Sequence, residues 1–104
     1  MKIIDNYLDK YYARKVIDLA CGHLAAVFNL KTVVNYDSVL KEWLIEAVYV
    51  HKNNNYTIPY LRLPRRSAPE ILFRLLSVGW KELDYGSDTC LGLVKRINDI
   101  KEQQ

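Results

Sequence analysis

The sequence is poor in the residues that form most metal sites. It has 2 cysteines and 2 histidines, so a zinc ion held by soft ligands would need all four of Cys21, His23, His51 and Cys90. A single residue separates Cys21 from His23, whereas two to four residues usually separate paired zinc ligands. We therefore predict no metal and no cofactor, and we interpret His23 as a hydrogen-bonded histidine of the core.

Glycine is also scarce, with 4 in 104 residues. None belongs to a phosphate-binding glycine loop, and the G-x-S-x-G motif of a nucleophilic serine is missing. Neither cysteine has a basic residue beside it in the sequence that would activate its thiol. The acidic pairs Asp5/Asp9 and Glu42/Glu46 have a spacing typical of solvated helix surfaces. These absences favour a protein that is not an enzyme.

Long apolar runs are missing as well. No stretch approaches the roughly 18 to 20 residues of a membrane span, and the first residues, MKIIDNYLDKYY, place acids where a secretion signal is apolar. We expect a soluble cytoplasmic protein, without a membrane partner, in which both cysteines remain reduced thiols. A chain with 50% hydrophobic and 26% charged residues predicts one globular domain over 1–104, with 101–104 frayed.

What the sequence does contain is helical periodicity. Residues 3–28 place apolar side chains at steps of three and four, which predicts an amphipathic helix that Gly22 could divide. Residues 29–35 indicate a turn with a short extended piece. A second helix is expected from Asp37 or Ser38 to His51, because aspartate and serine are good caps. As an alternative, residues 47–63 could form a hairpin around the asparagine-rich turn, with Pro59 on an edge strand.

A third helix has the clearest start. The segment Ser67-Ala68-Pro69-Glu70 fits the capping box, in which serine and glutamate cap the first turn, and Gly79 is a natural stop. A fourth helix is expected from Ser87 or Asp88, with Cys90 on its inner face. The predicted fold class is therefore mainly α, with about four helices in one compact domain and the hairpin 47–63 as an alternative between the second and third helices.

The positive charge is concentrated in the middle of the chain. The net charge is +3 overall, but residues 47–80 carry five basic residues against Glu70, a net of +4, which leaves −1 for the rest. All 3 prolines lie in the same region. A local excess of this size favours an anionic partner.

Tyrosines accompany these basic residues. In an extended segment Tyr60 and Arg62, together with Tyr56, would share one side and could stack bases while the cation meets phosphate. Arg65 and Arg66 precede the third helix, whose free amides attract anions, although Glu70 would compete for them. The predicted binding patch consists of Lys52, Tyr56, Tyr60, Arg62, Arg65, Arg66 and Arg74.

From this patch we predict a small non-enzymatic protein that contacts nucleic acid. The alternative is an adaptor or inhibitor that docks through the same patch on a larger protein, such as a nucleic-acid-processing complex, because tyrosine and arginine also dominate protein interfaces. Either role would suit a phage or mobile-element accessory protein, and a homo-oligomer stays open. A helix-turn-helix is disfavoured because the connection 80–87 is too long.

Overall fold

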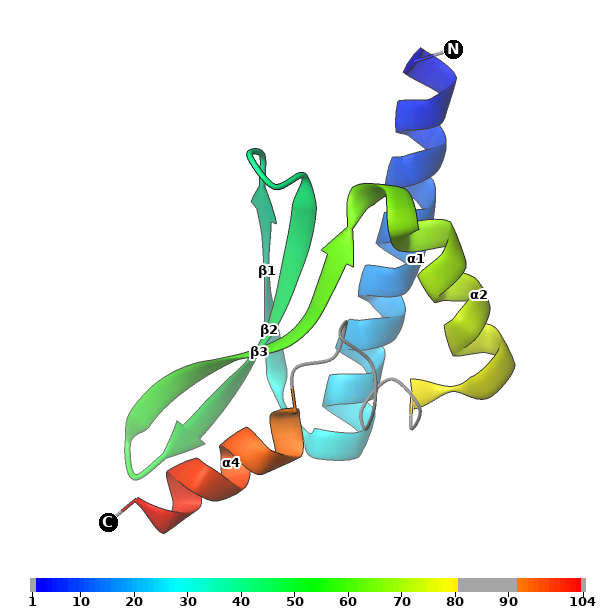
Figure 1. Ribbon diagram of the computed structural model, residues 1–104. Coiled ribbons are helices and arrows are strands. Elements are labelled where there is room, and N and C mark those ends of the chain that lie inside the picture. The colour runs from blue at the N-terminus through cyan, green and yellow to red at the C-terminus, as the bar shows by residue number, and fades with distance from the viewer. Residues whose placement is uncertain (1, 81–91, 104) are drawn as a thin grey trace.

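The computed structural model describes residues 2–80 and 92–103, with side chains from Asp9 onward (Figure 1). The elements are α1 (Lys2–Phe28), β1 (Lys31–Asp37), β2 (Glu42–His51), β3 (Asn54–Pro64), a 3-10 turn (Arg65–Ser67), α2 (Ala68–Val78) and α4 (Leu93–Glu102). The strands form one antiparallel sheet in the order β1-β2-β3. The expected mainly α class is therefore wrong: the described chain has an α/β fold with three helices and a three-stranded sheet.

The first helix is confirmed. Helix α1 is continuous over 27 residues and passes through Gly22 without a break. Its buried stripe follows the helical period through Ala13, Val16, Ala20 and Leu24, each at most 1% exposed. Small residues at two of these positions let the neighbouring elements approach the helix closely. No helix among the described residues is long and apolar enough to cross a membrane.

The second helix is wrong, because residues 42–51 form strand β2. Most positions in this segment are apolar, so its pattern fits both a helix and a strand, and its β-branched and aromatic residues favour the strand. Asp37 does cap backbone amides, as predicted, but within a turn. Its Oδ1 accepts hydrogen bonds from the N–H groups of Val39 and Leu40 at 2.9 and 3.0 Å, which closes the connection between β1 and β2.

The alternative hairpin is present and is longer than 47–63. Strands β2 and β3 pair from Glu42 opposite Pro64 to His51 opposite Asn54. Lys52 and Asn53 connect them with φ angles of 51° and 66°, which is the left-handed conformation of a tight two-residue hairpin turn. Strand β3 is an edge of the sheet, which is where proline at position 59 is tolerated.

A bulge in β3 decides which side chains reach the core. Ile45 pairs with Leu61 and Glu46 pairs with Pro59, so Tyr60 is an extra residue. An extra residue reverses the alternation of faces along a strand. Tyr60 and Leu61 are consequently both fully buried, and exposed Arg62 lies on the other face of the sheet from Tyr60.

The third helix is confirmed at both ends, but its capping box is not formed. Helix α2 starts directly after Ser67, whose side chain makes no capping hydrogen bond. It ends at Gly79, which has a φ of 80° and donates its N–H to the Leu75 carbonyl at 3.1 Å. The predicted start of a fourth helix at 87 or 88 lies outside the described residues, as does position 90. Helix α4 includes residues 101 and 102 of the expected frayed tail.

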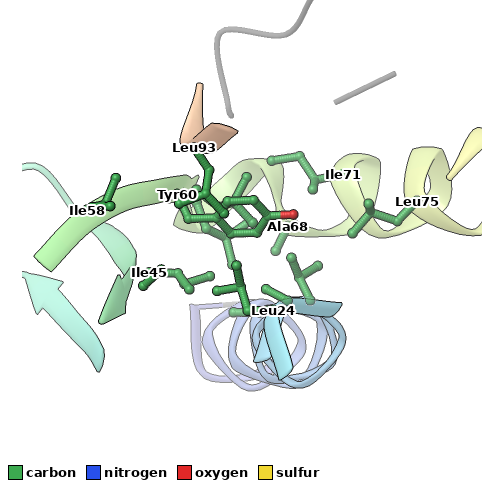
Figure 2. Close-up of a cluster of buried hydrophobic side chains, with 14 residues drawn as sticks. Leu24, Ile45, Ile58, Tyr60, Ala68, Ile71, Leu75 and Leu93 are labelled. Atoms are coloured by element: carbon green, nitrogen blue, oxygen red, sulfur yellow. The ribbon is translucent and has the colours of Figure 1, made fainter. Parts of the chain in front are cut away.

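The core lies between the sheet and the helices. Figure 2 shows side chains from α1, β2, β3, α2 and α4 converging. Its labelled members are Leu24 of α1, Ile45 of β2, Ile58 and Tyr60 of β3, Ala68, Ile71 and Leu75 of α2, and Leu93 of α4. Burial of this apolar surface is the main force that stabilises the fold. The opposite face of the sheet is only partly buried.

Candidate functional site

The predicted patch is spread along β3, the turns at its two ends and α2, and the two ends of β3 lie far apart (Figure 1). Lys52 lies in the turn before the strand, whereas Arg65 and Arg66 follow its last residue. Strand β3 has 11 residues, and an extended chain rises about 3.3 Å per residue, so the two ends lie roughly 30 Å apart. The seven predicted residues therefore do not form one surface.

The two tyrosines of the patch pack inward. Tyr60 is 0% exposed, and its hydroxyl shares a hydrogen bond of 2.7 Å with Nδ1 of His23. The His23 ring stacks on Trp80 with centroids 4.7 Å apart. His23 is therefore hydrogen-bonded, as predicted, but it is only half-buried and lies at the edge of the core. Tyr56 is half-buried and packs against the same core. A buried ring cannot stack an exposed base, so Tyr60 supplies no such platform.

Arg62 and Arg74 do not join Arg65: Arg62 lies near the same end of β3 but on the outer face of the sheet, and Arg74 lies on α2. Arg62 projects from the outer face of the sheet, where its side chain is 58% exposed and its Nε lies 3.9 Å from Oε1 of Glu42. Exposed pairs at such distances contribute little to stability. Arg74 is half-buried on α2 and has interactions within the fold.

The remaining two arginines, Arg65 and Arg66, lie beside Lys41, which is not among the predicted site residues. Lys41, Arg65 and Arg66 line one hollow of about 250 Å³, together with Leu40 and Pro64. We call it the basic hollow. Lys41 comes from the turn between β1 and β2, and the arginines come from the 3-10 turn after β3. The Arg65 N–H donates a hydrogen bond of 3.0 Å to the Lys41 carbonyl, which fixes the two segments together.

The cations of the basic hollow are only partly compensated. Nε of Arg65 donates to Oδ2 of Asp9 on α1 at 3.2 Å, and the two side chains are 28% and 20% exposed. A guanidinium has five N–H donors, so its terminal nitrogens can still bind another acceptor. Lys41 and Arg66 are exposed, and within the described part of the chain neither forms an ion pair. The hollow therefore keeps a positive charge.

The start of α2 adds to this positive potential. The 3-10 turn that carries Arg65 and Arg66 leads directly into the helix, whose first amides point their N–H groups toward its N-terminus. The Ser67 side chain makes no hydrogen bond to these amides, and Pro69 in the first turn has no N–H to present. Glu70 is exposed in the first turn, so the acid expected to neutralise this end extends into solvent.

Comparisons with protein families, with curated proteins and with solved structures find no match to the chain. Across residues 2–80 and 92–103, no three His, Cys, Asp or Glu residues are grouped in a way that could hold a metal ion. The Cys21 thiol is half-buried and not in a disulfide. Within the part of the chain that the structure describes, the basic hollow combines three cations with a concave shape.

Proposed function

We propose that the protein is a binding protein that contacts the phosphates of a nucleic acid through the basic hollow. One observation carries this proposal: three cations from two segments that are distant in sequence line the same hollow. Arginine and lysine are the side chains that most often bind phosphate oxygens, through charge-assisted hydrogen bonds. The hydrogen bond between the Arg65 amide and the Lys41 carbonyl holds the cations in place before binding.

The proposed contact is to the backbone of the nucleic acid rather than to its bases. The tyrosine best placed in sequence to stack a base, Tyr60, is fully buried, and the cations of the hollow recognise charge. Binding is therefore expected to depend little on base sequence. Three phosphate contacts would give a log–log salt slope of about −2.7 for a duplex and about −2 for a single strand, with affinity lost as salt rises.

The test measures binding of labelled duplex and single-stranded DNA and RNA over a series of salt concentrations. The double variant Lys41→Ala/Arg66→Ala should reduce the slope by about two and weaken binding by tens of fold at about 0.1 M salt. The matched control is Lys95→Ala/Lys101→Ala, which removes the same charge from exposed positions on α4. Equal losses in both double variants, or no binding by the wild type at low salt, would contradict the proposal.

A second candidate function, docking on a larger protein as an adaptor or inhibitor, has support from α2. Phe73 and Leu76 lie one helical turn apart and are 70% and 72% exposed, and large exposed aromatic and aliphatic side chains on one face are typical of protein interfaces. A photo-crosslinking amino acid in place of Phe73 should trap one defined partner, and Leu76→Ser should abolish that product. If instead no defined product forms, this candidate is wrong.

A further inference from the structure

The two edges of the sheet differ in how well they are protected against pairing with another strand. Strand β3 contains Pro59, which has no N–H to donate, and its regular pairing is interrupted by the bulge at Tyr60. It also ends at Pro64. Natural proteins use such features to keep edge strands from pairing with other chains. This edge of the sheet is therefore poorly suited to pairing with another strand over its length.

Strand β1 has none of these features. Its 7 residues contain no proline and pair with β2 without a bulge, from Lys31 opposite Val48 to Asp37 opposite Glu42. Because alternate residues of an edge strand point their N–H and C=O groups away from the sheet, this edge presents a regular row of donors and acceptors. Apolar side chains accompany it: Val33, Val34 and Tyr36 are 39%, 37% and 44% exposed.

The sequence of β1 is complementary to itself in one antiparallel register. If the β1 strands of two copies pair antiparallel with Val34 opposite Val34, Lys31 of each strand lies opposite Asp37 of the other. These two charge pairs lie at the two ends of the paired segment. Residues directly opposite in an antiparallel pair share a face of the sheet, so each lysine can reach the facing carboxylate. Oδ1 of Asp37 accepts the turn amides, which leaves Oδ2 for the lysine of the second copy.

From this complementarity we propose that β1 is a docking edge for a second copy of the chain. Two copies would pair antiparallel through their β1 strands and form a continuous six-stranded sheet, with Val34 facing its counterpart at the centre. Seven-residue strands bury less than the roughly 800 Å² per partner of a standard interface. The dimer should therefore be weak, with a dissociation constant in the micromolar range or above. This inference does not depend on the proposed nucleic-acid contact.

Sedimentation velocity between about 10 μM and about 1 mM protein tests the proposal, because weak dimers populate over that range. The wild type should move from monomer to dimer as concentration rises. Lys31→Glu and Asp37→Lys should each weaken self-association at least about tenfold, because each variant places two like-charge pairs across the strands. Circular dichroism of each variant confirms that it remains folded.

Mixing the two variants tests the register itself. In a heterodimer of Lys31→Glu with Asp37→Lys, each new glutamate faces a new lysine and each wild-type lysine faces an aspartate, so an equimolar mixture should dimerise as well as the wild type. A wild type that stays monomeric up to the highest concentration would overturn the proposal. So would a Lys31→Glu variant that dimerises normally, or a dimer that is lost on Phe73→Ser, since the contact would then use α2.

Discussion

The two ends of strand β3 carry similar basic residues but form different surfaces. At the start of β3, Lys52 lies in a tight turn next to half-buried His51. At its end, Arg65 and Arg66 meet Lys41 from another turn, and the three side chains line a hollow. A cation-rich segment of this chain thus forms a candidate site only where a second segment adds further charge and a concave shape.

The largest effect that separates the two ends is expected from charge reversal. Arg66→Glu removes one cation of the basic hollow and adds a repulsive charge, so it should weaken nucleic-acid binding by on the order of a hundredfold at about 0.1 M salt. Lys52→Glu changes the net charge equally at the other end and should weaken binding by less than about threefold, through long-range repulsion alone. Fluorescence anisotropy of a labelled duplex measures both.

If Arg66→Glu and Lys52→Glu weaken nucleic-acid binding equally, the two ends of β3 do not differ in function. The contact would then depend on the overall charge of the chain, and the basic hollow would have no special role.

A smaller effect is expected from removing the hydroxyl of the buried tyrosine. Tyr60→Phe breaks the hydrogen bond to His23 and should lower the free energy of unfolding by about 1 kcal/mol. The matched change Tyr56→Phe, at a half-buried position, should lower it less. Urea denaturation measures both differences. Binding should be unchanged, because the Tyr60 ring lies in the core; a Tyr60→Phe variant with normal stability and reduced binding would contradict this placement.

The smallest effect is expected at Asp9, the carboxylate that compensates one cation of the basic hollow. Asp9→Asn removes the negative charge beside Arg65, so it should strengthen binding by roughly twofold. It should lower the free energy of unfolding by less than about 1 kcal/mol, as is usual for partly exposed ion pairs. Binding titrations and thermal melts test the two statements separately. Weaker binding in this variant would show that Asp9 orients Arg65 for the ligand.

The sequence contained enough information to predict the helices whose ends are marked by local signals. The periodicity of residues 3–28 and the stop at Gly79 act locally, so α1 and α2 were predictable. Strand β2 was not, because a mostly apolar segment satisfies both helical and extended patterns, and its pairing with β1 and β3 decides between them.

The candidate site was only partly predictable for the same reason. Arg65 and Arg66 stood out because they precede a helix start, but Lys41 reaches them only through the turn that closes against β3. The direction of Tyr60 depends on a bulge that no local pattern indicates. The signal that remained in the sequence was Asp37, whose capping preference marked the start of the turn that carries Lys41.

Two-dimensional NMR of the labelled protein during titration with a short duplex at low salt can locate phosphate binding residue by residue. If phosphates bind in the basic hollow, the amide signals of Lys41, Arg65 and Arg66 should shift together and saturate with one affinity, while those of Lys52 and Asn53 stay unchanged. Shifts confined to the hairpin turn, or no shift at any ratio of duplex to protein, would contradict the account.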